Sequence, residues 1–191
     1  MINNQNGIYN LLKAEPLIPV VAIENYKQLD EIAKSLLERK IFCIEITLRT
    51  TFSWQAIERA KLNYGELLKI GVGTVISKNQ INKAKDHGVD FIVSPGTTDV
   101  LLEELVLSKT PFLPGVSTVS DILRAIEYKC DFLKFYPAIQ SGGIKMLENY
   151  EKLFPNIKFC PTGGIGAINF KSFLELKNVV SVGGSWLGNF K

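Results

Sequence analysis

The strongest constraint in this sequence is a repeated alternation between short apolar runs and longer amphipathic runs. The short runs are rich in β-branched residues and bounded by turn residues, a pattern typical of buried parallel strands rather than helices. We predict strands at residues 17–23, 41–47, 68–72, 90–93, 112–113, 131–135, 158–160 and 179–182.

The longer runs between these strands carry apolar residues at helical spacing. The clearest spans residues 26–39, with leucine and isoleucine on one stripe and charges on the opposite face. Similar patterns predict helices at 55–62, 78–87, 100–107, 119–128, 144–153 and 168–176. Hydroxyl side chains that suit the N-cap position precede several of them: Ser53, Ser77, Thr98, and Ser117 or Thr118.

Strands that alternate with helices in this way form a parallel sheet with right-handed crossovers. The short repeat favours an α/β fold of the (β/α)8 TIM-barrel type over an open doubly wound sheet, and no GxGxxG motif follows the first strand. We therefore predict a single barrel domain over residues 1–191. Only residues 183–191 follow the last predicted strand, so the closing C-terminal helix is expected to be missing or very short.

Charge and composition exclude several classes of protein. The net charge is +3 and the basic residues are scattered, which argues against nucleic-acid binding. No apolar stretch approaches the ~20 residues that span a bilayer, and the N-terminus lacks the pattern of a signal peptide. The three cysteines and the single histidine form no metal-binding motif. We expect a cytoplasmic protein with reduced thiols, no membrane span, no metal and no cofactor.

Two charged residues, Glu45 and Lys134, interrupt predicted strands near their C-terminal ends. Period-two alternation places each of them on the face opposite to the aliphatic residues beside it. If those aliphatic residues pack against the helices, both charged side chains point into the barrel. The C-terminal mouth of such a barrel is where its active site lies.

The apolar neighbours of Lys134 suggest a nucleophile. Such surroundings disfavour the ammonium form, so part of the side chain is expected to be neutral near neutral pH. A neutral amine can attack a ketone to form an imine. Each residue alone has an ordinary interpretation, because a strand lysine can protect a sheet edge and a strand glutamate such as Glu45 can simply pair with a lysine. Together they predict two groups that face one another across the mouth, within reach of one small ligand.

Other polar residues follow strand ends at the same mouth. Arg49 has a fork geometry that suits a substrate carboxylate, although a solvated loop arginine is the ordinary alternative. Thr74 ends the third strand and can either reach the same carboxylate or cap the next helix. Glycine pairs follow the seventh and eighth strands, where barrels often bind phosphate through backbone N–H groups. These pairs are Gly163 with Gly164, and Gly183 with Gly184.

Seven short motifs, in order along nearly the whole chain, match one known family. They are EITLRT at 45–50, GVGTV at 71–75, SPG at 94–96, PGVST at 114–118, KFYPA at 134–138, CPTGGI at 160–165 and GGSWL at 183–187. On these motifs the chain resembles the 2-keto-3-deoxy-6-phosphogluconate (KDPG) aldolase / 4-hydroxy-2-oxoglutarate (KHG) aldolase family of class I aldolases. Family members usually continue past the last motif into a further helix.

The resemblance implies a reaction and a role for each matching residue. The reaction is cleavage of KDPG to pyruvate and glyceraldehyde 3-phosphate, or of KHG to pyruvate and glyoxylate, through a lysine Schiff base. The resemblance also implies a homotrimer that acts on a small ketoacid without a metal or other cofactor. The implied roles are Lys134 for the Schiff base, Glu45 for acid/base catalysis, Arg49, Thr74 and Pro95 for the substrate carboxylate, Thr162 for stereochemistry, and Gly163, Gly164, Gly184 and Ser185 for phosphate.

Two other functions fit parts of the pattern. A phosphate-binding TIM-barrel isomerase or epimerase would use a pair of carboxylates and form no imine. A non-catalytic binding protein derived from an aldolase would keep the fold without turnover. The apolar setting of Lys134, the single strand-end glutamate and the complete set of site residues favour the aldolase.

Overall fold

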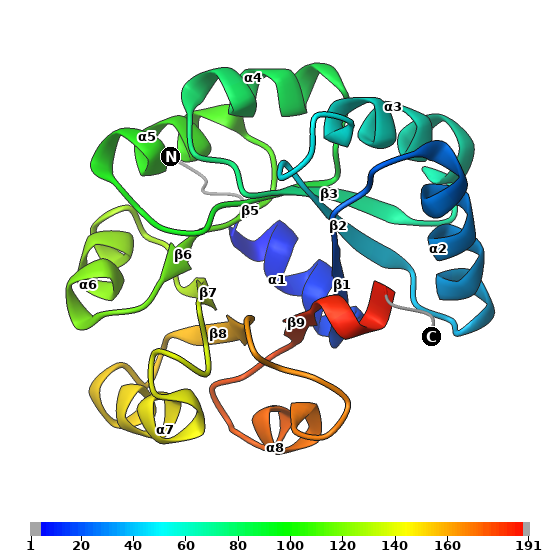
Figure 1. Ribbon diagram of the computed structural model, residues 1–191. Coiled ribbons are helices and arrows are strands. Elements are labelled where there is room, and N and C mark those ends of the chain that lie inside the picture. Colours follow the sequence, from blue (N-terminus) through cyan, green and yellow to red (C-terminus); the bar gives the residue numbers. More distant parts are fainter. Residues whose placement is uncertain (1–4, 189–191) are drawn as a thin grey trace.

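The computed structural model describes residues 5–188 and has parallel strands at its centre, surrounded by helices (Figure 1). The strands form a curled arrangement of two sheets, ordered β5-β4-β3-β2-β1-β9 and β6-β7-β8. The strands are β1 (Leu17–Val21), β2 (Cys43–Thr47), β3 (Lys69–Gly73), β4 (Phe91–Val93), β5 (Phe112–Leu113), β6 (Gly115–Val116), β7 (Phe132–Phe135), β8 (Lys158–Pro161) and β9 (Val182–Gly184).

The helices mostly lie between consecutive strands along the chain, as the alternating pattern predicts. They are α1 (Gln5–Ala14), α2 (Tyr26–Glu38), α3 (Ser53–Tyr64), α4 (Lys78–Asp86), α5 (Asp99–Ser108), α6 (Val119–Glu127), α7 (Gly143–Leu153), α8 (Phe170–Leu174) and the short 3-10 helix η1 (Ser185–Gly188).

The two sheets approach one another at both margins. Between β5 and β6 only Pro114 intervenes, and a proline has no N–H to continue a ladder. Its carbonyl still accepts the N–H of Lys134 at 2.9 Å, which ties the junction to β7. At the other margin isolated parallel bridges join Phe159 to Val179 and Thr162 to Gly183. The α/β class and the parallel, curled sheet are therefore confirmed.

The predicted strands match the observed ones with small shifts. The fifth run continues past Pro114 into β6, and the ladder of the last strand begins at Val182 rather than at residue 179. Among the predicted N-caps, Ser77, Thr98 and Thr118 each accept a backbone N–H at a helix start. The prediction for Ser53 is wrong. This residue lies inside the first turn of α3, where its hydroxyl donates to the Thr47 carbonyl at 2.8 Å.

The 3-10 helix η1 packs beside β1 near the end of the described residues. Leu187 is buried, and its carbonyl accepts a hydrogen bond from Arg39 at the end of α2 at 3.0 Å. Trp186 packs on Phe170 of α8, with ring centroids 6.0 Å apart. In Figure 1 η1 lies beside β1, so one short turn fills the space between α8 and α2. Residues 189–191 lie outside the described range.

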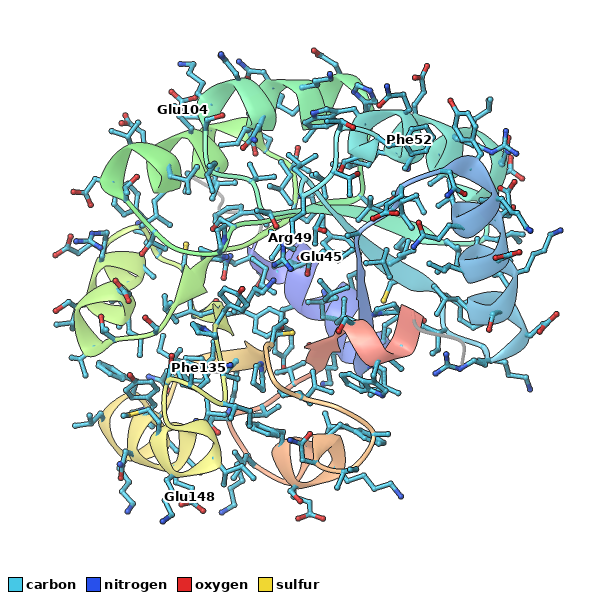
Figure 2. The ribbon with its side chains drawn as sticks, in the orientation of Figure 1. Glu45, Arg49, Phe52, Glu104, Phe135 and Glu148 are labelled. Carbon is cyan, nitrogen blue, oxygen red and sulfur yellow. The ribbon has the colours of Figure 1, made fainter. Side chains whose placement is uncertain are left out.

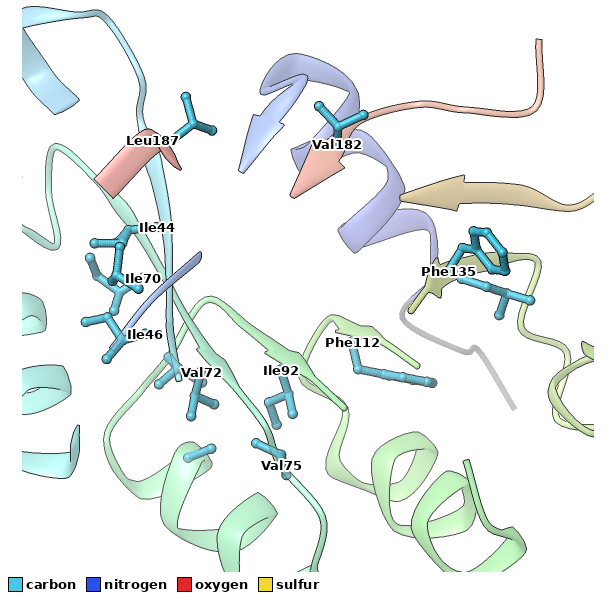
Figure 3. Close-up of a cluster of buried hydrophobic side chains, with 14 of the residues drawn as sticks. Ile44, Ile46, Ile70, Val72, Val75, Ile92, Phe112, Phe135, Val182 and Leu187 are labelled. Atoms are coloured by element: carbon cyan, nitrogen blue, oxygen red, sulfur yellow. The ribbon is translucent and has the colours of Figure 1, made fainter. Parts of the chain in front are cut away.

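Apolar side chains form two separate clusters, one on each face of the strands. The larger cluster lies between strands and helices and includes Ile44, Ile46, Ile70 and Val72 (Figure 3). The second lies on the concave inner face of the curled sheets, and we call it the interior cluster. Its members are Ile8, Leu12, Ile18, Cys43, Phe91, Val93, Leu113, Phe132 and Cys160.

Helix α1, which the strand pattern did not predict, contributes to the interior cluster. Its Ile8 and Leu12 are buried against the strands, and its Gln5 spans β5 and β7. The Gln5 amide donates to the carbonyl of Phe112 at 2.9 Å and accepts the N–H of Phe132 at 2.9 Å. These bonds satisfy backbone groups at the margin between the two sheets. Within residues 5–188, no helix is long and apolar enough to cross a membrane.

Candidate active site

The side chains of Glu45 and Lys134 meet on the concave inner face of the curled sheets, and we call them the charged pair. The Lys134 Nζ lies 3.1 Å from Oε1 and 3.4 Å from Oε2 of Glu45. Both residues are 3% exposed. The sequence predicted two groups that face one another across the mouth, within reach of one small ligand, and the structure places them in direct contact.

Strand alternation explains why both side chains point inward. On β2, Cys43 belongs to the interior cluster while Ile44 and Ile46 face the helices, so Glu45 faces inward. On β7, Phe132 belongs to the interior cluster, so Lys134 also faces inward. The predicted faces of both strands are confirmed. The pair therefore lies above the interior cluster, toward the C-terminal ends of the strands.

Burial of the charged pair has a chemical consequence. An isolated buried charge is strongly disfavoured, but two opposite charges in contact compensate one another. The contact also gives Glu45 direct access to a proton on Lys134, which leaves a neutral amine when the proton moves. The ring of Tyr136 lies beneath the lysine, with Nζ 5.4 Å from the ring centroid. An aromatic face at this distance favours a cation, whether an ammonium or a protonated imine.

The two cysteines of the interior cluster are poor competitors for the role of nucleophile. Burial raises the pKa of the Cys160 thiol to about 11, and burial raises the pKa of Cys43 well above its usual value. Both thiols are therefore neutral at physiological pH, and a neutral thiol is a weak nucleophile. Among residues 5–188, no group of three or more His, Cys, Asp or Glu side chains is arranged to hold a metal ion. The side chain of Lys134 is the amine of this interior, in contact with the Glu45 carboxylate.

Arg49 and Thr74 lie together at the mouth above the charged pair. The Arg49 Nε donates to the Thr74 hydroxyl at 3.2 Å, and Arg49 is exposed to solvent. Thr74 has a positive φ of 63°, a conformation that threonine rarely adopts. In Figure 2 both Arg49 and Glu45 lie near the centre of the view. The alternative that Thr74 caps the next helix is wrong, because Ser77 does so.

The predicted carboxylate contact Pro95 is half-buried in the loop after β4. Its backbone is closely packed, because a Cβ added at Gly115 would lie 2.3 Å from the Pro95 carbonyl carbon. Ser94 braces the same loop: its hydroxyl donates to the Gly96 carbonyl at 2.9 Å and accepts the Gly115 N–H at 3.3 Å. Pro95 is therefore held at the same end of the strands as the charged pair.

Thr162, Gly163 and Gly164 follow β8, as predicted, whereas Gly183 and Gly184 are the last two residues of β9 rather than part of a loop after it. Thr162 is 5% exposed, and a Cβ added at Gly183 would lie 2.4 Å from its hydroxyl oxygen. Lys134 and Cys160 are register partners, so Thr162 lies two residues beyond the lysine's neighbour on β8. Gly163 and Gly164 have φ values of 101° and 75°, which residues other than glycine rarely adopt. The bridge from Thr162 to Gly183 holds the two segments side by side.

Two features of this site have no clear signal in the sequence. Tyr136, under the lysine, reads as one more apolar residue directly after the strand. Gly73 reads as part of a turn, yet it lies directly against the Glu45 side chain. Only the GVGTV and KFYPA motifs themselves contain these positions.

A buried lysine and a single carboxylate in contact, at the C-terminal ends of parallel strands, define an enzyme that can form an imine with a carbonyl substrate. Comparison with known proteins identifies the family. The family model described as "Aldolase: KDPG and KHG aldolase" matches residues 8–191. The chain belongs to the KDPG and KHG aldolase family.

Individual relatives agree with this assignment. A KHG/KDPG aldolase of Escherichia coli (strain K12) is 34% identical over 187 residues, covering 98% of this chain and 87% of that protein. A crystal structure of KDPG aldolase from Legionella pneumophila, with pyruvate captured at low pH as a covalent carbinolamine intermediate, superimposes with a TM-score of 0.90 at 38% identity, covering 93% of this chain and 86% of that one. A KDPG aldolase of Zymomonas mobilis ZM4 with 3-phosphoglycerate has a TM-score of 0.89 at 34% identity, covering 94% and 85%.

The protein is therefore an aldolase, a carbon–carbon lyase that cleaves KDPG, KHG or both. The predicted resemblance and the predicted reaction are confirmed. The isomerase and the non-catalytic binding protein, the two other functions that the sequence left open, are not supported by these relatives.

Proposed function

We propose that Lys134 forms the Schiff base and that Glu45 is the acid/base group of this aldolase. The observation that carries the proposal is the buried contact of 3.1 Å between Lys134 Nζ and Glu45 Oε1. Acid/base catalysis requires a group within hydrogen-bonding reach of the proton that it moves, and this contact provides that reach.

The reaction then runs as follows. Glu45 accepts a proton from Lys134, and the neutral amine attacks the C2 ketone of the substrate. A proton shift from nitrogen to oxygen gives a carbinolamine. Glu45 then returns its proton to the carbinolamine hydroxyl, which leaves as water, so that a protonated imine and an ionised Glu45 remain. Glu45 next takes the proton of the C4 hydroxyl, the C3–C4 bond breaks toward the imine, and an aldehyde leaves. The remaining enamine is protonated at C3, and hydrolysis releases pyruvate and the free lysine.

Arg49, Thr74 and Pro95 are proposed to hold the substrate carboxylate. Arg49 is exposed at the mouth and already bonded to Thr74, so its guanidinium is placed where a carboxylate can join the two. Thr162, buried next to the β8 register partner of Lys134, is proposed to influence which face of the aldehyde reacts.

The substrate phosphate is proposed to bind the loop after β8, through Gly163 and Gly164, and the junction of β9 with η1, through Gly184 and Ser185. The bridge between Thr162 and Gly183 supports this, because it brings both segments to one place. Gly164 and Ser185 are exposed there, so backbone N–H groups and a hydroxyl are available to an anion. The support comes from these segments and not from a helix dipole, since α8 and η1 are short.

The fold is proposed to be one closed (β/α)8 barrel. The continuity of β5 and β6 through Pro114 supports closure at one margin, and the two isolated bridges to β8 support it at the other. The chain is also proposed to act in the cytoplasm as a homotrimer. The buried thiols of Cys43 and Cys160 suit a reducing compartment. Exposed apolar side chains on α5 and α6 suit an association surface: Val100, Leu107, Val119, Leu123 and Ile126.

Pyruvate release measured side by side on KDPG and KHG tests the phosphate proposal. Ser185→Ala is expected to raise KM for KDPG about tenfold or more, on the scale of a lost hydrogen bond to a charged group, and to leave KM for KHG unchanged. Equal loss on both substrates would contradict the assignment of these segments to phosphate.

A further inference from the structure

Gly73 lies against the carboxylate of the charged pair. A Cβ built at this glycine would lie 2.1 Å from Oε1, 2.7 Å from Cδ and 2.8 Å from Cγ of Glu45. The three atoms closest to that Cβ are thus all on one side chain, and the nearest is the oxygen that contacts Lys134. These separations are far below an ordinary van der Waals contact.

The Glu45 side chain has few other positions to adopt. It is 3% exposed and faces the interior from β2, directly beside β3 in the sheet. The interior cluster lies on one side of it, and Lys134 lies on the other. A methyl group at position 73 must therefore move the carboxylate away from the lysine or push the two strands apart.

We propose that Gly73 is a positioning residue for catalysis: the absence of a side chain there lets the Glu45 carboxylate lie against Lys134. The proposal rests on the proposed function, because it matters for turnover only if Glu45 is the acid/base group. It assigns Gly73 no contact with the substrate.

Gly71, two residues earlier on β3, supplies a matched control. A Cβ there would lie 2.2 Å from two ring carbons of Phe91, and its three closest atoms all belong to that ring. Both glycines face inward from the same strand, but Gly71 makes room for the interior cluster and Gly73 for the charged pair. The same substitution at the two positions therefore separates packing from catalysis.

The first experiment compares Gly73→Ala with Gly71→Ala. For Gly73→Ala we expect kcat to fall at least about tenfold, within the ~10²–10⁴-fold range of acid/base catalysis, with a changed pH–kcat profile. Exchange of the pyruvate methyl protons with deuterated solvent, followed by NMR, should slow by a similar factor, because the same acid/base step removes those protons. For Gly71→Ala we expect a lower melting temperature with kcat and pH profile retained. A wild-type kcat and pH profile in folded Gly73→Ala would overturn the proposal.

A double-mutant cycle then asks whether Gly73 acts through Glu45. Glu45→Ala removes Cγ, Cδ and Oε1, the three atoms that an alanine at 73 would meet. In that background Gly73→Ala is expected to change the exchange rate by less than about twofold. It should change the melting temperature by no more than a few degrees. The effects of the two substitutions are then not additive. Additive effects would overturn the proposal. If Gly73→Ala alone does not fold, the double variant should regain folding, and failure to regain it would also overturn the proposal.

Glu45→Gln keeps this inference distinct from the proposed function. A fully active Glu45→Gln enzyme would remove Glu45 from the mechanism and refute the proposed function itself. An inactive Glu45→Gln enzyme together with a fully active Gly73→Ala enzyme would refute only the role of Gly73.

Discussion

The charged pair and two members of the interior cluster come from the same two strands, two residues apart. Cys43 and Phe132 lie in the interior cluster, and Glu45 and Lys134 lie one inward-facing position further along β2 and β7. The first two are sealed from below by α1, whereas the second two lie toward the mouth with Arg49. The positions that stabilise the fold and the positions proposed for catalysis thus form two successive layers of one interior. Substitutions in one layer should affect stability, and substitutions in the other should affect turnover.

The largest effect is expected in the charged pair. Lys134→Met keeps much of the side-chain volume but removes the only amine of the pair, so turnover should fall by about 10⁴-fold or more, as when a covalent nucleophile is lost. Pyruvate release from KDPG and KHG measures this. Lys158→Met on β8, whose ammonium bonds to the carbonyl of Lys177 at the surface, is the control and should retain activity. Substantial turnover by Lys134→Met would show that the charged pair is not needed for catalysis.

The next effect is expected in the interior cluster. Phe91 is fully buried, so Phe91→Ala should lower the free energy of unfolding by about 3–5 kcal/mol through lost burial and a cavity. Because Phe91 lies below the charged pair, kcat of the folded fraction should stay near the wild-type value. Urea unfolding and a kcat measurement at low temperature check both parts. A loss of kcat without a loss of stability would reverse the assignment of the layers.

A smaller effect is expected where α1 closes the interior. Gln5→Ala leaves the carbonyl of Phe112 and the N–H of Phe132 without their amide partner, a cost of about 1–3 kcal/mol for buried groups. The N-terminal segment should then be cleaved faster by protease in native conditions. Asn10→Ala, at an exposed position of the same helix, is the control and should leave stability within about 0.5 kcal/mol. Equal effects of the two changes would show that α1 does not seal the interior through Gln5.

The smallest effect concerns the start of α6, outside both layers. Burial raises the pKa of Asp121, but hydrogen bonds from Ser117 and Thr118 outweigh it and hold that pKa below its usual value. A carboxyl with a lowered pKa in the folded state stabilises the protein above the pKa of the unfolded chain, and this contribution disappears as pH falls through the folded value. The free energy of unfolding of Asp121→Asn should therefore fall less than that of the wild type as the pH drops below about 4. The difference should be smaller than the ~1 kcal/mol typical of a helix cap. Unfolding curves from pH 7 downward measure this, with exposed Asp131→Asn as the control. An unchanged pH dependence in Asp121→Asn would contradict it.

The sequence predicted most of the strand framework, because period-two alternation directly encodes which side chains face inward. It placed Glu45 and Lys134 on the correct faces of β2 and β7 for this reason. It missed β6 because two residues after a proline carry too little pattern to be recognised. It missed α1 because a helix that closes the end of the curled sheets belongs to no strand–helix repeat.

The detailed geometry of the site lay beyond the sequence. Alternation gives the face of a side chain but not its reach, so the sequence left open whether Glu45 pairs with a lysine, and the structure shows that it contacts Lys134. The close approach of Gly73 to Glu45 depends on how two neighbouring strands pass one another. The contact of η1 with the rest of the fold depends on the packing of Trp186 and Leu187. From the sequence, the segment that contains them looked too short to close the fold.

Borohydride reduction in the presence of pyruvate, followed by peptide mass mapping, tests the central claim most directly. A protonated imine between pyruvate and a lysine is reduced to a stable adduct, so the labelled peptide identifies the reacting amine. We predict a single adduct, on the peptide that contains Lys134, and none in Lys134→Met. An adduct on any other lysine, or no adduct in an enzyme that releases pyruvate, would contradict the account.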